Sequence, residues 1–242
     1  CGVPSVSLVC DGFIGQGAMV SQGLGIAGLP MAAIPGHVDG QSYAELQRSI
    51  AHLTYAKVVE HLTLPVAQSA DTLSRNAGEV AASGSFTEVN AAFAASGWTD
   101  GLPVIPPTRS LVDTFVAHVP DASTRVIGVM SPSGSAATVL NVAINGVMAG
   151  CKPEYMPVLL AIAEVLCDPH YGVEHSGDTT GGDALIVVSG PVVEALLFNC
   201  EEGALRDGSV ANTSIGRFLR LYLRNVAGFI PGGADKSTFG HT

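Results

Sequence analysis

Short apolar runs and longer stretches with helical periodicity divide the chain into successive elements. The short runs are rich in β-branched residues and are followed by glycine, proline or aspartate, a pattern typical of buried strands. They predict strands at residues 3–10, 31–34, 125–130 and 184–189. The periodic stretches predict helices at residues 15–29, 42–62, 86–95, 110–116, 136–149, 154–166, 191–198 and 212–226. This order of elements predicts a mixed α/β fold.

Residues 3–62 predict half of an open parallel sheet. Strand, helix, strand and helix follow in that order, which implies parallel strands joined by right-handed crossovers. Ser42 is the expected N-cap of the helix at 42–62, and Glu45 stands at the capping-box position. We therefore expect a partial, Rossmann-like parallel-sheet region at the N-terminus, followed by a second α/β domain.

Breaks in the pattern indicate where the domains meet. Pro65 ends the long helix, and the residues after it are small and irregularly spaced. We expect a partial parallel α/β domain over residues 1–64, a helical linker region over 65–97, and a second α/β domain over 98–242 that carries the main candidate site. This second domain opens with a loop at 98–108, which three prolines make rigid.

Composition narrows the classes of function. The chain has 242 residues, of which 47% are hydrophobic and 13% charged, so it can bury a large core. Its net charge of −10 argues against nucleic acid as a partner, and no apolar stretch is long enough for a membrane span. We expect a small-molecule substrate, and the apolar, glycine-rich helices predict a homo- or hetero-oligomer.

The cysteines indicate free thiols rather than disulfides. They are odd in number, widely spaced and without any Cys-x-x-Cys pair: Cys1, Cys10, Cys151, Cys167 and Cys200. This pattern predicts reduced thiols and a cytoplasmic location, and it is a poor match for structural zinc. The chain also begins with Cys1 instead of Met, within a predicted strand. We therefore expect a missing N-terminal part, or a partner chain that supplies it.

Two of these cysteines carry candidate chemistry. Cys10 ends the first predicted strand, and open α/β sheets bind ligands at the carboxyl ends of their strands. His37 lies in the loop after the second strand and is a further catalytic candidate. Cys151 stands beside Lys152 and near a helix start, an arrangement that lowers the pKa of a thiol. The alternative for either cysteine is a small hydrophobic residue of the core.

The glycine-rich loop at residues 168–183 is the main candidate for catalysis. It precedes a predicted buried strand, and loops on a rigid α/β scaffold often carry function. The spacing of its two histidines is no recognised metal signature, so we predict no metal; the alternatives are a metal site that includes Glu174 and an ordinary surface loop. The candidate acids and bases are His170, His175 and Asp178, and the candidate substrate contacts are Thr179 and Thr180.

Two polar features of the middle region could contact a substrate. Ser131, Ser133 and Ser135 lie between a predicted strand and a predicted helix, where free backbone N–H groups can hold a carboxylate or phosphate. Asn141 and Asn145 stand one turn apart on an otherwise apolar helix and need hydrogen-bond partners. The alternatives are capping of the helix by the serines and bonds from the asparagines to a neighbouring loop.

The last predicted helix carries a basic cluster. Arg217, Arg220 and Arg224 fall near one stripe of that helix. A solvated face or a subunit contact is the favoured interpretation, and a clamp for an anionic ligand is the alternative. Asn212 and Thr213, at the start of the helix, are further candidates for ligand contact.

Several stretches resemble a bacterial, selenoprotein-related family that is named for a selenocysteine/cysteine-Gly-Ser-Cys motif. The resemblance lies in residues 2–13 and 28–37, and a companion region of that family is similar over residues 98–108 and 145–155. It implies an α/β first region and a thiol-linked enzyme. The naming motif is absent from this chain and would precede residue 1, so the family's reactive cysteine corresponds to no residue here.

These observations favour a small-molecule enzyme that uses thiol or acid–base chemistry, of redox or lyase type, on a polar, carboxylate-bearing substrate. The sequence leaves the cofactor open. One alternative is a non-catalytic subunit or binding module of a hetero-oligomeric enzyme, whose reactive cysteine lies on a missing segment or a partner chain. A second is a metal-dependent lyase or hydrolase, which stoichiometric metal in an elemental analysis would reveal.

Overall fold

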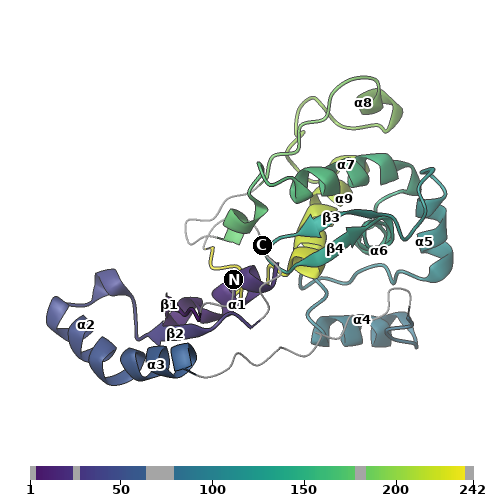
Figure 1. The fold of residues 1–242 in the computed structure, drawn as a ribbon. Helices are drawn as coiled ribbons and strands as arrows, with labels where there is room; N and C mark the ends of the chain where they lie inside the picture. Colours follow the sequence, from purple (N-terminus) through teal and green to yellow (C-terminus); the bar gives the residue numbers. More distant parts are fainter. Residues whose placement is uncertain (1–3, 24–27, 64–78, 178–183, 238–242) are drawn as a thin grey trace. The chain divides into compact units, whose positions relative to one another are not determined.

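Helices and short strands build two compact units along the chain. The computed structural model describes residues 4–23, 28–63, 79–177 and 184–237 (Figure 1). One unit comprises residues 1–74 and 132–134, and the other comprises 75–131 and 135–242. Helices and strands are mixed, and a small parallel sheet is present, so the predicted α/β class is confirmed at this level. The Rossmann-like arrangement and the domain boundaries at residues 64 and 97 stay predictions.

A parallel pair of strands organises the first unit. β1 (Ser7–Cys10) pairs with β2 (Met31–Ile34) in register, from Ser7 opposite Met31 to Cys10 opposite Ile34. A 3-10 turn and α1 (Ile14–Gly23) follow β1. Gly17 lets α1 approach the strands closely, because a Cβ at this position would lie 2.9 Å from the sulfur of Met31. The parallel pairing confirms the predicted strand order.

The long helix predicted at 42–62 is interrupted. It consists of α2 (Tyr43–Ser49), a π-helical turn (Ile50–Thr54) and α3 (Tyr55–Thr63). Ser42 caps α2 as predicted, and its backbone N–H donates to Glu45 Oε2 at 2.9 Å to close the capping box. The hydroxyl of Thr54 donates to the carbonyl of Ala33 in β2 at 2.8 Å. This bond ties the π turn to the sheet.

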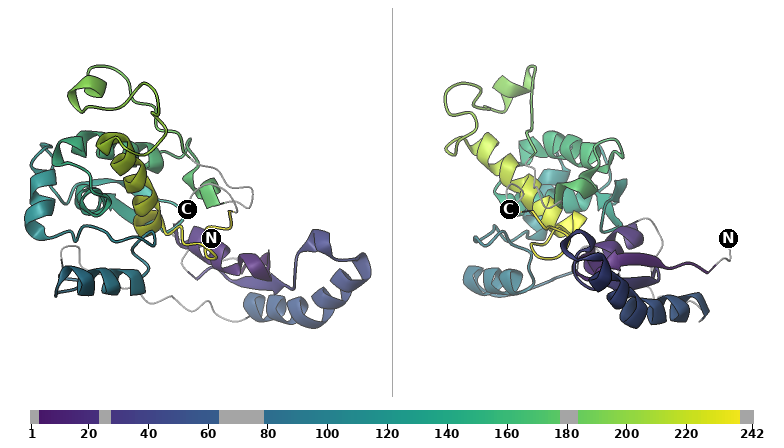
Figure 2. Two further views of the ribbon diagram at one scale, coloured as in Figure 1. Left: turned by 180° about the vertical axis from the view of Figure 1, so that it is seen from behind. Right: turned by 90° about the vertical axis from the view of Figure 1, so that its left-hand side faces the viewer.

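One apolar helix forms the centre of the second unit. α6 (Val139–Ala149) lies among α5 (Arg109–Val116), α7 (Met156–Cys167) and α9 (Val210–Tyr222) (Figures 1 and 2). Its neighbours contribute large, fully buried side chains to the core, among them Tyr155, Met156, Leu159, Phe218, Leu221 and Tyr222. The second unit is therefore a helical core around α6.

A short antiparallel hairpin packs on this core, and it corrects one prediction. β3 (Val126–Met130) pairs with β4 (Ser135–Thr138), whereas the sequence predicts that residue 136 starts a helix. α7 lies so close to β3 that a Cβ added at Gly128 would come within 2.7 Å of the Cβ of Cys167. The small residues before α6 extend because β3 supplies a hydrogen-bonded neighbour.

The segment at 184–189 is not the buried strand that its apolar sequence predicts. Leu185 is 70% exposed and Val187 is 80% exposed, and no described residue pairs with this segment as a strand. A strand needs a hydrogen-bonded neighbour as well as an apolar sequence, and the described part of this unit provides none here. The remaining helices are α4 (Phe86–Ala95), α8 (Val192–Ala195) and a π turn (Leu223–Ala227) that continues α9.

Candidate functional site

Cys10 lies at the carboxyl edge of the first unit's sheet, and His37 lies in the segment that leaves this edge. β1 ends at Cys10, which is in register with Ile34, the last residue of β2. Because the strands are parallel, the segments that leave them emerge at the same edge, and His37 follows β2 by three residues. The ring of Phe13, just after β1, meets the His37 ring edge-on with centroids 6.2 Å apart. These two sequence candidates therefore belong to one edge of one sheet.

The turn after β2 is held by hydrogen bonds around His37. The side-chain amide of Gln41 donates to the carbonyl of Pro35 at 2.5 Å and to that of His37 at 3.2 Å. The backbone N–H of Asp39 donates to Nδ1 of His37 at 3.3 Å, which leaves the proton of the neutral ring on Nε2. The Asp39 carboxylate lies 3.8 Å from the same Nδ1 and is the partner of the charged ring.

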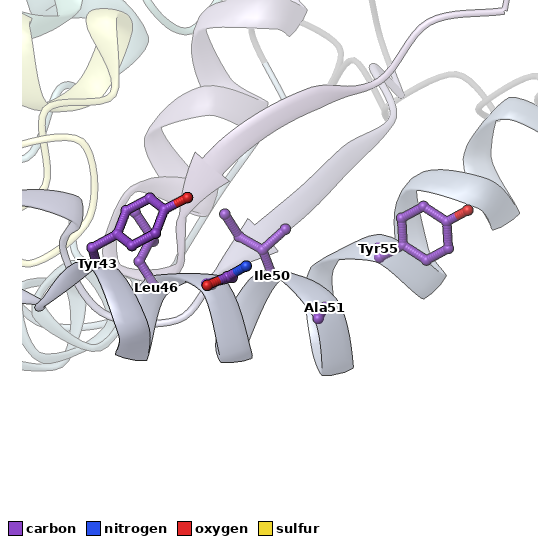
Figure 3. Close-up of a pocket in the computed structure, with 6 residues that line it drawn as sticks. Tyr43, Leu46, Ile50, Ala51 and Tyr55 are labelled. Atoms are coloured by element: carbon purple, nitrogen blue, oxygen red, sulfur yellow. The ribbon is translucent and has the colours of Figure 1, made fainter.

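The first unit also contains an apolar hollow, whose lining includes no catalytic candidate. It has a volume of about 390 Å³ and runs along α2 and the π turn (Figure 3). None of its lining residues is charged, and the side chains of Tyr43 and Tyr55 are exposed. Because it offers no acid, base or nucleophilic thiol, it is no candidate for catalysis. Its lining consists of Tyr43, Leu46, Gln47, Ile50, Ala51 and Tyr55.

The described part of the loop at 168–183 buries Val173 but exposes both of its histidines. A 3-10 helix spans Val173–Gly177, and the side chains of His170 and His175 face solvent. Nδ1 of His170 lies 2.8 Å from Oδ1 of Asp168, and the His170 backbone N–H donates to the same oxygen. Both bonds lower the pKa of the Asp168 carboxyl, and the bond from the backbone N–H has the larger effect. Asp178, Thr179 and Thr180 lie outside the described residues. The catalytic role of this loop stays a prediction.

The turn at 131–135 does not start a helix, so the argument for anion binding there is wrong. The turn joins β3 to β4, and α6 begins only at Val139. Thr138 caps α6, because its hydroxyl accepts a hydrogen bond from the backbone N–H of Asn141 at 3.2 Å. No helix start lies at this turn to support a substrate contact by the serines. That contact stays a prediction for Ser131, Ser133 and Ser135.

Asn141 and Asn145 find their partners inside the protein. Oδ1 of Asn141 accepts from the backbone N–H of Thr138 at 2.8 Å, and its Nδ2 donates to the carbonyl of Ala136 at 2.9 Å. Asn145 is buried, and its Nδ2 donates to the carbonyl of Asn141 at 2.8 Å. Its Oδ1 accepts from Nδ2 of Asn225 at 2.8 Å. Both amides therefore stabilise α6 and its contact with the end of α9.

Asn212 closes the loop that precedes α9. Its Oδ1 accepts from the backbone N–H of Asn199 at 2.9 Å, and its Nδ2 donates to the carbonyls of Asn199 and Ala204 at 2.9 Å each. Its neighbour Thr213 is exposed. The amide of Asn212 thus serves the fold of the loop, an arrangement that the sequence does not predict.

Arg217 forms an ion pair with a residue of the proline-rich loop, and the sequence could not predict this ion pair. Its Nε and Nη2 donate to the two carboxylate oxygens of Asp100 at 2.8 and 2.9 Å, and Nη2 also donates to the carbonyl of Pro103 at 2.9 Å. Partial burial acts to raise the pKa of Asp100, but the hydrogen bonds and charge of Arg217 outweigh it, so this pKa is lowered. Arg217 is therefore not part of a solvated face.

Two further side chains after α9 hold the same loop. Nε of Arg224 donates to the carbonyl of Gly97 at 2.7 Å, and Nδ2 of Asn225 donates to the carbonyl of Trp98 at 3.2 Å. Oδ1 of Asn225 is buried and accepts no hydrogen bond from the described residues. The bonded residues lie 127 positions apart in the chain, and no local sequence pattern links residues at such a separation.

Cys151 is a buried core residue rather than a reactive thiol. Its Sγ donates to the carbonyl of Ser214 at 3.3 Å, and burial raises the pKa of the thiol to about 12. This corrects the prediction that Lys152 and a helix start lower this pKa. Lys152 pairs with Glu154 instead, whose Oε1 lies 3.9 Å from Nζ of Lys152. Cys10 is half-buried and Cys200 is exposed, so both are more accessible than Cys151.

The described ranges were also searched for metal sites and membrane spans. Over these ranges, no three histidine, cysteine, aspartate or glutamate side chains gather as ligands for a metal ion. No helix within them has the length and apolar character needed to cross a membrane. The predicted oligomeric state and location stay predictions.

The first unit thus contains a two-stranded parallel sheet, with a thiol at the end of β1 and an imidazole three residues after β2. Parallel α/β sheets bind ligands at the carboxyl ends of their strands. Residues 1–64, which include both strands, match the model of the UGSC family. This match confirms the family resemblance for that segment. No curated protein and no solved structure matches the chain.

Proposed function

We propose that this chain is a small-molecule enzyme that uses the Cys10 thiol and the His37 imidazole on a polar, carboxylate-bearing substrate, in a reaction of redox or lyase type. The observation that carries the proposal is the common carboxyl edge of β1 and β2: Cys10 is the last residue of β1, and His37 follows β2 by three residues. The UGSC match over residues 1–64 covers both strands of this edge and both candidate residues. The histidines of the loop at 168–183 are a second source of acid and base groups.

The chemistry of the two residues is complementary. In the proposed step, the Cys10 thiolate forms a bond to an electrophilic carbon of the substrate. The electron pair displaced from that carbon moves onto the adjoining oxygen, which gains negative charge. His37 stabilises that oxygen through a hydrogen bond from Nε2–H, while its Nδ1 accepts from Asp39 and keeps the ring in this tautomer.

Alkylation with a pair of matched reagents tests the proposal. Iodoacetate and iodoacetamide both alkylate a thiolate with loss of iodide, but only the first carries a carboxylate. We expect the ratio of iodoacetate to iodoacetamide rates at Cys10 to exceed the ratio at exposed Cys200 by about tenfold, because a carboxylate is recognised beside Cys10. Peptide mass spectrometry of the full chain measures both sites in one sample.

The variants and the contrary result are equally defined. His37→Ala should reduce the rate ratio at Cys10 towards that of Cys200, since it removes the Nε2–H donor. Equal ratios at the two cysteines would contradict carboxylate recognition beside Cys10. In a turnover assay, once a substrate is found, full activity of Cys10→Ser would remove the thiol from the mechanism.

A binding subunit of a hetero-oligomeric enzyme is the second candidate. It is favoured by the internal hydrogen bonds of Asn141 and Asn145, because these amides are taken up by the fold rather than offered to a substrate. An activity that appears only when a second chain with its own reactive cysteine is added would support this candidate. Turnover by the purified chain alone would exclude it.

A further inference from the structure

A cavity of about 270 Å³ lies at the carboxyl end of α9, within the second unit. Its lining includes Asp100 and Gly101 of the proline-rich loop, together with Arg220 and Arg224. Leu223, Phe229 and Pro231 add apolar surface. The cavity therefore combines cationic side chains with an apolar wall.

We propose that this cavity binds a small molecule in which one carboxylate is attached to an apolar body, and that Arg224 binds the carboxylate. Nε of Arg224 donates to the carbonyl of Gly97 at 2.7 Å, which fixes the plane of the guanidinium. No acidic side chain of the described ranges pairs with Arg224, so its two terminal amino groups are available. A guanidinium held by Nε offers two parallel donors that match the two oxygens of a carboxylate.

The acidic residue in the lining does not cancel this positive charge. Both oxygens of Asp100 are hydrogen-bonded to Arg217, at 2.8 and 2.9 Å, so that carboxylate is neutralised within its own ion pair. Arg220 adds a second guanidinium to the cavity. The cavity thus concentrates positive charge in a chain whose net charge is −10, and it attracts an anion locally.

The same surroundings favour a carboxylate over a phosphate. The cavity lies at the C-terminal end of a helix, where the macrodipole is negative and disfavours further negative charge. A monoanion is therefore better tolerated there than a dianion. Leu223, Phe229 and Pro231 line the same cavity and supply the apolar part of its wall, which suits a hydrocarbon body. The inference concerns the second unit alone and does not depend on the thiol chemistry of Cys10.

Titration calorimetry with the full chain tests this site. The probes are benzoate and 3-methylbutanoate, with benzamide as the neutral match of benzoate and inorganic phosphate as the competing anion. We expect at least one carboxylate to bind about tenfold more tightly than benzamide or phosphate, because only a carboxylate makes the two charge-assisted bonds. Equal binding of benzoate and benzamide, tighter binding of phosphate, or no binding of either carboxylate would overturn the proposal.

Variants of the arginines place the ligand. Arg224→Gln should weaken carboxylate binding by about ten- to a hundredfold, as expected for the loss of charged hydrogen bonds. Arg206→Gln, in the exposed loop before α9, is the matched control and should leave the affinity unchanged. Since Arg224 also holds Gly97, circular dichroism must show that the variant is folded; if it is not, Arg224→Lys serves in its place, because lysine keeps the charge but lacks the two parallel donors. An unchanged affinity in the folded variant refutes the assignment.

Discussion

The ion pair between Asp100 and Arg217 can be tested by removing each partner in turn. Two hydrogen bonds of 2.8 and 2.9 Å join the side chains, which are 15% and 24% exposed. Exposed pairs contribute about 0–1 kcal/mol, and breaking a fully buried pair costs about 3–5 kcal/mol. For this half-buried pair we expect Asp100→Asn to lower the free energy of unfolding by about 2 kcal/mol. Arg217→Gln should cost somewhat more, because it also loses the bond to the carbonyl of Pro103.

The chain carries its own reporter for this measurement. Trp98 is the only tryptophan, it lies two residues before Asp100, and its ring packs on Phe93 with centroids 5.4 Å apart. Urea unfolding at pH 7, followed by tryptophan fluorescence, therefore reports on the second unit. In the double variant the two losses should fall short of additivity by about 1–2 kcal/mol. Additive losses, or single losses below about 0.5 kcal/mol, would refute the energetic role of the pair.

The same pair predicts how stability depends on pH. The pKa of Asp100 is lowered in the folded protein, so the carboxylate form is favoured by folding. This contribution is complete above the unfolded pKa of about 3.9 and is lost as the pH falls through the lower folded value. In Asp100→Asn, the free energy of unfolding should therefore fall less steeply as the pH is lowered. An unchanged acid limb in that variant would contradict the assigned pKa shift.

Three further substitutions and one alkylation experiment test separate features of the structure. Gly128→Ala should destabilise the chain by about 1–3 kcal/mol, because its Cβ would lie 2.7 Å from that of Cys167. Gly216→Ala, with open space around it inside α9, should stabilise the chain by about 0.5–1 kcal/mol in the same urea titration. Leu197→Gly should raise stability by about 1 kcal/mol, since Leu197 is 74% exposed and has a φ of 59°. Cys151 should resist alkylation at pH 8 while Cys200 reacts, and comparable rates would contradict the raised pKa of Cys151.

The parts of the fold that depend on neighbours in sequence were predictable. The capping box at Ser42 needs only Glu45 three residues later, and the parallel strands follow from the order of strands and helices at 3–62. The carboxyl edge with Cys10 follows from the same order, since ligands bind where parallel strands end. These signals lie within one element or between adjacent elements.

The parts that depend on distant partners were not predictable. The run at 184–189 has a strand sequence, but a strand forms only where a second one is available, and no described residue pairs with it. Conversely, β4 forms at residues that resemble a helix start, because β3 lies beside them. The pKa of Cys151 was misjudged for the same reason: Lys152 is adjacent in sequence, but burial decides the shift. Local sequence contains the tendency, and the tertiary neighbour decides the outcome.

Positive charge at the end of α9 has two roles, and they are physically linked. Arg217 and Arg224 fix residues 97–103, and this fixed loop in turn carries Asp100 into the wall of the cavity that Arg224 lines. A ligand on Arg224 binds only the folded loop, so its binding adds to the stability of the second unit. A variant that loosens the loop, such as Asp100→Asn, should weaken ligand binding although Arg224 itself is unchanged. The anion site is therefore a property of tertiary packing, which explains why an acidic composition gives no sign of it.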